Sequence, residues 1–273
     1  MNALPNPERE FAHPTLRVVS ADDEQKDNVA TTAGEKLAKL ELTQELADEL
    51  KFKNTEFESA DPETILSWAA DRFGQKLTFA TAFGPEGMVI LHLISKLKLD
   101  VHCFNLDTGY QFAETLELRE KVLTQFGLEV ELARPDQSVA EFEKQHGKLY
   151  LSDPNQCCQE RKIKVLHRMI EGKHGWVSAI RRDQSPDRAQ APIVGWDAKF
   201  NLVKVNPLAN LTKSHIWKTI LDNNVPYNPL HDQGYPSIGC EPCTRPIQIG
   251  EDERAGRWSG SAKTECGLHS LKD

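Results

Sequence analysis

Hydrophobic positions along the chain follow two different periods. Where apolar residues recur every three or four positions, the pattern predicts amphipathic helices, and short runs rich in Val, Leu and Phe predict strands. Helices are predicted over residues 35–52, 60–74, 86–97, 112–127, 139–147 and 212–224. Strands are predicted over residues 76–84, 99–107, 128–135 and 175–181, with a hairpin over 191–208. Strands that alternate with helices of this length indicate an α/β fold, a mostly parallel twisted sheet with helices on both faces.

The two ends of the chain lack such a pattern. Residues 1–36 mix Pro, Asp, Glu, Thr and Gly without apolar periodicity, which predicts a disordered N-terminal tail. From Pro226 onward turn residues dominate, and the last stretch is predicted to be a flexible or ligand-ordered tail. A chain of 273 residues can bury a sizeable core, so we expect one main domain between these ends.

Composition and charge narrow the class of protein. With 39% hydrophobic residues, 27% charged residues and a net charge of -8, the chain is mildly acidic, which disfavours non-specific nucleic-acid binding. Residues 1–150 carry 16 Lys and Arg against 27 Asp and Glu, whereas residues 151–273 carry 17 against 14. We therefore expect the second half to bind any anionic ligand. No apolar run reaches ~18 residues and no signal peptide is evident, so we expect a cytoplasmic protein that does not bind membranes.

Four of the six cysteines form two pairs, Cys157 with Cys158 and Cys240 with Cys243. In a reducing cytosol such spacing indicates metal binding or catalysis rather than disulfides. Zinc usually takes thiolates that are separated by two or more residues, whereas adjacent cysteines can each reach a different iron of a cube. The pattern favours a 4Fe-4S cluster, and structural zinc and buried or thioredoxin-like thiols remain as alternatives.

The other two cysteines differ in their surroundings. Cys266 lies in the C-terminal stretch between Lys263 and His269, where nearby cations would favour a nucleophilic thiolate on a mobile segment. An incidental tail cysteine is the alternative. Cys103 lies inside an apolar strand, which predicts a packed core residue.

Two arginine clusters indicate recognition of phosphate or sulfate. Arg181, Arg182 and Arg188 follow a predicted strand, and Arg254 and Arg257 lie three residues apart. Either cluster alone fits a solvated basic face. Both lie near cysteine motifs in the only half with a positive net charge, which favours anion binding.

Two turns follow the first predicted strands. Residues 80–87 open a helix, so their backbone amides could bind a nucleotide, although the sequence is not a Walker motif. Residues 106–109 end the next strand and place Asp107 and Thr108 where they could border the same crevice. Each turn alone is a weak signal.

Five motifs, in this order, resemble the assimilatory adenylyl-sulfate (APS) reductases, the iron-sulfur branch of the APS/PAPS reductase family. They read CC followed by RK, then RRDQSP, GYPSIGCEPCTRP, GEDERAGRW and ECGLH. The resemblance covers about residues 70–273. It implies an adenine nucleotide alpha hydrolase-like fold over residues 37–250, including the cluster site, and a catalytic C-terminal tail over 251–273. The implied activity is reduction of adenosine 5'-phosphosulfate to sulfite and AMP by thioredoxin or a glutaredoxin-like donor, in sulfate assimilation and cysteine biosynthesis.

The resemblance also implies roles for individual residues. Cys266 matches the family's nucleophile, which leaves an S-sulfocysteine that thioredoxin resolves, and the four paired cysteines match the ligands of one 4Fe-4S cluster. Residues that match substrate contacts are Lys162, Arg254, Arg257 and His269 around the phosphosulfate, and Thr81, Phe83, Gly84, Leu106 and Gly109 around the nucleotide. Lys162 follows Cys158 by four residues, so on a helix it would share its face and bridge cluster and substrate. A homo-oligomer is compatible with the family.

Three alternative functions stay open. The first is reduction of 3'-phosphoadenylyl sulfate (PAPS), although the family branch that prefers it usually lacks the cluster. The second is adenylation chemistry of the ATP-pyrophosphatase type, whose Ser-Gly-Gly-x-Asp-Ser loop is missing from TAFGPEGM. The third is a zinc-stabilised, non-catalytic nucleotide-binding module, which would leave Cys266 without a role.

Overall fold

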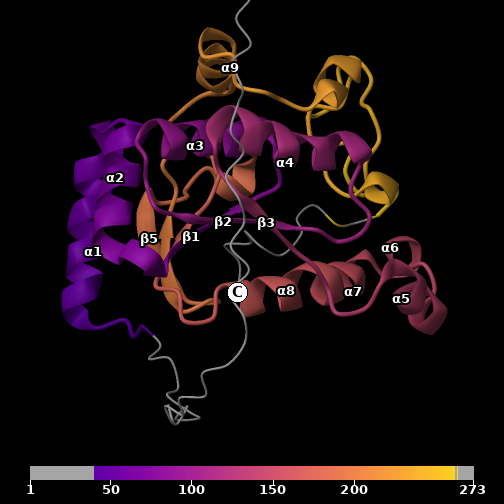
Figure 1. The fold of residues 1–273 in the computed structure, drawn as a ribbon, viewed down its shortest axis with the longest axis horizontal. Coiled ribbons are helices and arrows are strands. Elements are labelled where there is room, and N and C mark those ends of the chain that lie inside the picture. The colour runs from indigo at the N-terminus through magenta and orange to yellow at the C-terminus, as the bar shows by residue number, and fades with distance from the viewer. Residues whose placement is uncertain (1–39, 262, 264–273) are drawn as a thin grey trace, which may run out of the picture. The chain divides into compact units, whose positions relative to one another are not determined.

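A single twisted sheet organises the chain in the computed structural model, which describes residues 40–261 and 263. Its strand order is β3-β2-β1-β4-β6-β5 (Figure 1). The strands are β1 Leu77–Thr81, β2 His102–Leu106, β3 Val130–Ala133, β4 Gly175–Val177, β5 Val194–Asp197 and β6 Leu202–Val205. Neighbouring strands pair in parallel except for β5, which pairs antiparallel with β6 at one edge. The predicted mostly parallel sheet and the predicted hairpin are confirmed.

The helices begin where local sequence supplies caps. They are α1 Gln44–Glu56, α2 Pro62–Phe73, α3 Pro85–Lys96, α4 Ala113–Phe126, α5 Val139–His146, α6 Leu149–Ser152, α7 Pro154–Cys158, α8 Lys164–Met169 and α9 Lys213–Asp222. The side chains of Thr43 and Asp61 accept backbone N–H groups in the first turns of α1 and α2, and Ser138 and Thr212 form capping boxes. The helix predicted to start at residue 35 therefore starts at Gln44, because Thr43 caps it in an extended conformation.

The sheet buries both of its faces. In β2, Cys103 belongs to one hydrophobic core, whereas the next residue, Phe104, belongs to a second core on the other face. The same alternation places Val203 and Leu202 of β6 in different cores, because successive strand side chains point to opposite faces. Figure 1 shows α3, α4 and α9 on one side and α8 on the other. Burial raises the pKa of the Cys103 thiol to about 12, as expected for a core residue.

The strand order locates the ligand-binding edge. The chain passes from β1 through β2 to β3 at one edge, and β4 then pairs with the other side of β1. The order therefore reverses between β1 and β4. In open α/β sheets, ligands bind beyond the carboxyl ends of the strands at such a switch point.

The segment with the adjacent cysteines combines three short helical turns. Helix α7 ends at Cys158, a π-helical turn spans Gln159–Ile163, and α8 continues the segment. Isolated π-helical turns occur frequently at functional sites.

Several predictions concern the ends of the chain. The predicted tail 1–36 and the predicted site residues Cys266 and His269 lie outside the described residues. Among the residues that the structure describes, no helix is long and apolar enough to cross a membrane.

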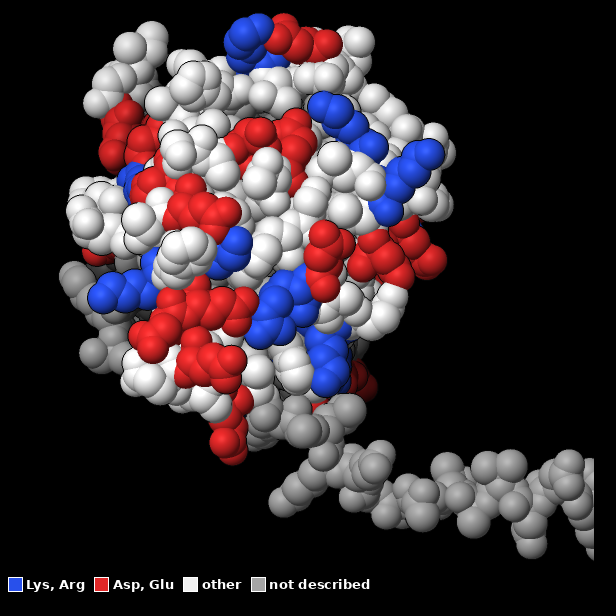
Figure 2. Space-filling model, turned by 90° about the vertical axis from the view of Figure 1, so that its left-hand side faces the viewer, with Lys and Arg blue, Asp and Glu red and all other residues white. Residues whose placement is uncertain are grey.

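The outer face that carries α1 and α2 has a mixed charge. Acidic and basic side chains are interspersed on it, without a continuous basic surface among the described residues (Figure 2).

Candidate nucleotide and iron-sulfur site

A cavity of about 260 Å³ opens at the switch point of the sheet. Its walls come from the ends of β1, β2 and β4, from the first turn of α3, and from residues 236–240 and 253–258. The second half of the chain thus supplies one whole wall. The cavity lies where the topology predicts a ligand site.

The turn between β1 and α3 forms the floor of the cavity. The Thr81 hydroxyl accepts the Phe83 N–H at 3.0 Å, and Gly84 precedes α3 in an extended conformation. Thr81 and Gly84 line the cavity, as predicted for nucleotide contacts. The Phe83 side chain is only 1% exposed, packs in the core and does not line the cavity. This placement does not support a side-chain contact of Phe83 with the nucleotide.

The end of β2 is held by a buried carboxylate. Asp107 accepts the Gly109 N–H at 2.9 Å and Arg134 Nε at 2.7 Å. Leu106 lines the cavity, whereas Gly109 does not. Gly109 has a φ of 78°, and a Cβ there would come within 2.6 Å of Val139 Cγ2. Gly109 is therefore required by the conformation of the turn, and it is not part of the cavity surface.

Two amide side chains in the wall were not predicted from sequence. Asn105 Nδ2 donates to the Thr81 carbonyl at 2.8 Å, and Gln111 Nε2 donates to Asn105 Oδ1 at 2.9 Å. Both residues line the cavity. The sequence contained a signal for Asn105, namely an amide inside an apolar strand. Such an amide is buried and therefore needs a polar partner.

Five cationic side chains line the cavity: Lys162, Arg181, Arg188, Arg254 and Arg257. The guanidinium of Arg257 donates to Ser237 Oγ and to the Ile238 carbonyl, both at 3.3 Å, and lies 4.5 Å from the centre of the Trp258 ring. The Arg257 guanidinium lies directly over Gly239, where a Cβ would collide with it. The predicted residues Lys162, Arg181, Arg254 and Arg257 are thus brought together around one cavity.

Arg181 and Arg182 point in different directions. Arg181 lines the cavity but is 3% exposed and pairs through Nε with Glu86 at 2.9 Å and through Nη1 with Asp183. Arg182 is absent from the cavity wall and pairs with Glu58 at 2.7 Å. The reason is the extended backbone at Arg181, which sends consecutive side chains to opposite sides. This placement does not support the predicted contact of Arg182 with substrate.

The four paired cysteines line one pocket that adjoins the cavity. Cys157 and Cys158 come from α7, whereas Cys240 precedes the 3₁₀ turn Glu241–Cys243 and Cys243 ends it. The turn is anchored to the end of β2 because the Glu241 N–H donates to the Tyr110 carbonyl at 2.7 Å. Lys162, Cys240 and Arg257 line both the cysteine pocket and the cavity. The two sites therefore share a wall.

The thiols respond differently to this environment. Burial, followed by the neighbouring cysteines, raises the pKa of Cys157 to about 12 and that of Cys243 to about 11. For Cys240, burial is the largest single influence and opposes the thiolate, but Lys162, Thr108 and Arg257 together outweigh it and lower the pKa. The site thus contains cations that favour negative charge on sulfur.

The four cysteines supply enough ligands for a metal site in one pocket, and their assignment to a 4Fe-4S cluster stays a prediction. In the described part of the chain, no three Cys, His, Asp or Glu side chains are arranged to hold a single metal ion. Four thiolates could serve the separate irons of a 4Fe-4S cube or one tetrahedral zinc ion, so the choice between them stays a prediction.

Charge supports the same assignment. Arg161, Lys162 and Arg257 line the pocket beside the cysteines. Arg161 is 3% exposed, and no carboxylate among residues 40–261 and 263 forms an ion pair with it. A buried cation is costly unless negative charge compensates it, and four thiolates on a cluster would supply that charge.

The fold and the cavity define a class of protein, one that binds a nucleotide at the switch point of a parallel α/β sheet. The chain belongs to the family of the phosphoadenosine phosphosulfate reductase domain, whose model matches residues 76–246. The matched range contains the sheet, the first cysteine pair and the second.

Individual relatives agree with this membership. The adenosine 5'-phosphosulfate reductase of Shouchella clausii is 46% identical over 219 residues, covering 80% of this chain and 91% of the relative. A phosphoadenosine 5'-phosphosulfate reductase of Gloeobacter violaceus is 44% identical over 219 residues, covering 79% and 91%. The phosphate complex of phosphoadenylyl-sulfate reductase from Candida auris superimposes with a TM-score of 0.66 at 31% identity, covering 75% of this chain and 98% of that one.

Proposed function

We propose that this protein reduces adenosine 5'-phosphosulfate to sulfite and AMP. The observation that carries the proposal is the shared wall between a cation-lined cavity at the switch point and a pocket of four cysteines. A sulfonucleotide needs a nucleotide site and concentrated positive charge. The names of relatives that are 42–48% identical support the same reaction.

The nucleotide half binds against the turn between β1 and α3. Thr81 and Gly84 offer polar backbone and side-chain groups there, and Leu106 offers an apolar contact at the end of β2. Lys162, Arg254 and Arg257 surround the phosphosulfate. Since attack by an anionic thiolate on an anionic sulfate is repelled, these cations lower the repulsion and stabilise the AMP that leaves.

Cys266 supplies the nucleophile in this proposal. Its thiolate attacks the sulfur of the sulfate group, a sulfur–sulfur bond forms, and the bond from sulfur to the bridging oxygen breaks with its electron pair on AMP. A thioredoxin thiolate then attacks Cys266 Sγ and sulfite leaves with the electron pair of the sulfur–sulfur bond. The second thioredoxin thiol resolves the mixed disulfide, so that thioredoxin is oxidised and the Cys266 thiol is restored.

Cys157, Cys158, Cys240 and Cys243 would hold one 4Fe-4S cluster. When bound, the cluster would supply negative charge to the site rather than the electrons for reduction. Lys162 lies between the two sites, so Lys162→Ala should depress turnover more than iron content. Lys162→Arg, which keeps the charge, should recover part of the turnover.

The substrate preference needs its own measurement, because relatives carry both names. We propose the form without a 3'-phosphate, and reduction of 3'-phosphoadenylyl sulfate is the second candidate. Turnover with both nucleotides at equal concentration separates them. A clear preference for the 3'-phosphorylated nucleotide would overturn the proposed substrate.

The reaction is tested by mixing the protein with adenosine 5'-phosphosulfate in the absence of thioredoxin. Mass spectrometry should then find one added SO₃ group on the peptide that contains Cys266, and Cys266→Ser should lack it while still binding AMP. Labelling on another cysteine, or sulfite release by Cys266→Ser at a normal rate, would overturn the nucleophile assignment. Anaerobically purified protein should be brown, with absorption near ~400 nm. The cytoplasmic location and a homo-oligomer stay predictions.

A further inference from the structure

Two carboxylates stand in the wall of a cavity that should attract an anion. Glu86 and Glu253 line the same cavity as the five cationic side chains. An unpaired carboxylate there would repel a sulfonucleotide. Glu86 is compensated within the wall, since Arg181 Nε lies 2.9 Å from its Oε1.

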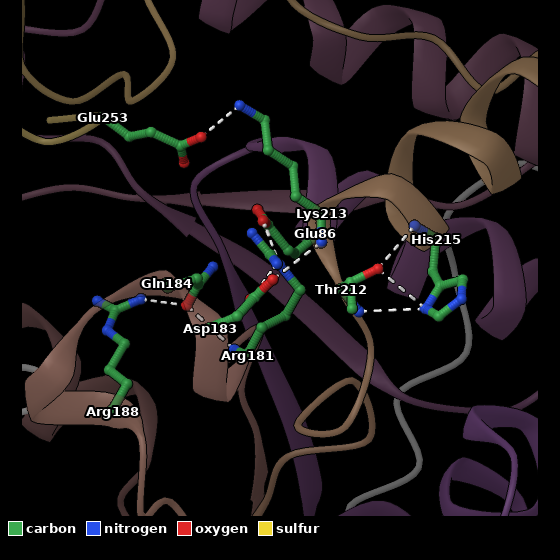
Figure 3. A network of polar contacts seen from close by, with 9 residues as sticks. All are labelled: Glu86, Arg181, Asp183, Gln184, Arg188, Thr212, Lys213, His215 and Glu253. Carbon is green, nitrogen blue, oxygen red and sulfur yellow. Dashed lines mark hydrogen bonds and ion pairs between the residues drawn. The ribbon is translucent and has the colours of Figure 1, made fainter. Parts of the chain in front are cut away.

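The negative charge of Glu253 is compensated by a residue outside the cavity wall. Its carboxylate forms an ion pair with the ammonium of Lys213, which is not itself part of the cavity lining (Figure 3). Figure 3 shows the Lys213 side chain extending from the start of α9 toward Glu253. The pair therefore joins α9 to the segment that carries Arg254 and Arg257.

The start of α9 is itself held by Asp183, which pairs with the cavity residue Arg181. The Lys213 N–H donates to Asp183 Oδ2 at 3.1 Å, and Asp183 also pairs with Arg181 (Figure 3). Thr212 adds a capping box that defines where the helix begins. The backbone position of Lys213 is therefore held by Asp183 and by the Thr212 cap.

We propose that Lys213 is a positioning residue for substrate binding, because it neutralises Glu253 and so prevents that carboxylate from repelling the anionic nucleotide. The inference rests on the proposed function. The Lys213 and Glu253 side chains are 47% and 49% exposed, so the pair adds little to folding stability. The pair instead affects the electrostatic potential beside Arg254. Lys213 and Glu253 together have a net charge of zero, and the loss of Lys213 leaves the negative charge of Glu253.

The test is a double-mutant cycle read by AMP binding in calorimetry and by steady-state turnover. Lys213→Met should weaken AMP binding about threefold at low ionic strength, and raise KM for adenosine 5'-phosphosulfate by a similar factor with kcat nearly unchanged. The double variant Lys213→Met/Glu253→Gln should bind AMP as the wild type does. The weakening should shrink as salt is added, because the charges are partly exposed.

Lys218→Met is the matched control. Lys218 lies on the same helix and forms an ion pair with Asp222, away from the cavity lining. Its loss should leave AMP affinity unchanged, which separates a local charge effect from a general change in α9.

Three results would overturn the inference: unchanged AMP affinity in Lys213→Met, a double variant as weak as the single one, or an equal loss in Lys218→Met. The wild type tests the proposed function separately from this inference. A wild type that binds AMP without reducing adenosine 5'-phosphosulfate would overturn the reaction alone, whereas a wild type that does not bind AMP would overturn both.

Discussion

The hydroxyl of Thr108 lies 3.2 Å from the Sγ of Cys240, a residue 132 positions away in the sequence. The carbonyl of the same threonine accepts Arg161 Nε at 2.6 Å, and Arg161 belongs to the π-helical turn that follows Cys158. The end of β2 therefore contacts the segments that carry both cysteine pairs. A small displacement of Thr108 would change the spacing of the proposed cluster ligands.

Thr108→Val should weaken retention of the cluster. Valine keeps the volume of threonine but cannot donate a hydrogen bond to the Cys240 thiolate, and the loss of such a partner usually costs about 10- to 100-fold in metal affinity. The rate of iron release to a chelator measures the effect. Thr124→Val, which removes an exposed hydroxyl from α4, should release iron at the rate of the wild type. Equal rates in both variants would contradict the assigned role.

Arg161→Met should destabilise the fold. Arg161 donates to two backbone carbonyls and lies 4.9 Å from the centre of the Phe142 ring and 5.4 Å from that of Tyr110. Its loss leaves the buried Thr108 carbonyl without this donor and removes the packing against both rings, and it should cost about 2–4 kcal/mol in the free energy of unfolding.

Urea unfolding of the apo and the iron-loaded protein measures this cost. Arg168→Met is the control, because Arg168 lies seven residues further along, in α8, and forms an exposed ion pair with Asp136. That variant should lose less than ~1 kcal/mol. A similar loss in both variants would show that burial of Arg161 contributes nothing special.

Gly239→Ala should impair substrate binding without removing a charge. A Cβ at residue 239 would collide with the Arg257 guanidinium, which must then leave its place between Ser237 and the cavity. We expect KM for adenosine 5'-phosphosulfate to rise about tenfold, equivalent to ~1.4 kcal/mol. Gly127→Ala, where nothing lies within 4 Å of the added Cβ, is the comparison at a strained but open position. An unchanged KM in Gly239→Ala would argue against a substrate contact of Arg257.

Arg182→Met should lower stability in a pH-dependent way. The Arg182 hydrogen bond is the main reason why the pKa of Glu58 lies below its ordinary value of 4.5. A lowered folded-state pKa contributes stability above the unfolded value, and that stability is lost as pH falls through the folded value. Because both groups are partly exposed, we expect less than ~1 kcal/mol at pH 7.

The difference in urea midpoint between wild type and Arg182→Met should therefore shrink as pH falls below 4.5. Part of it should persist at low pH, since Arg182 also donates to the Ala191 carbonyl at 2.8 Å. A difference that grows toward acid would have the wrong sign. AMP affinity in the same variant tests the original prediction of a substrate contact. A tenfold loss of affinity would support a contact between Arg182 and the substrate.

Most of the fold was predictable because its determinants are local. Thr43 and Asp61 cap helices through their own side chains, and apolar alternation in β2 and β6 follows from the two faces of a sheet. The cysteine spacing belongs to the same kind of information, since adjacent thiols imply separate irons whatever the surrounding fold. Residues by themselves thus determined the fold class, whereas the cluster at Cys157 and Cys158 stays a prediction.

The tertiary structure decided which side chains share a site. Arg181 and Arg182 are neighbours in sequence, yet one lines the cavity and the other pairs with Glu58, because an extended backbone separates them. Lys213 and Glu253 are 40 positions apart and form an ion pair. No local pattern reports such a contact, because it depends on how the tertiary fold places the start of α9 beside the segment that contains Glu253.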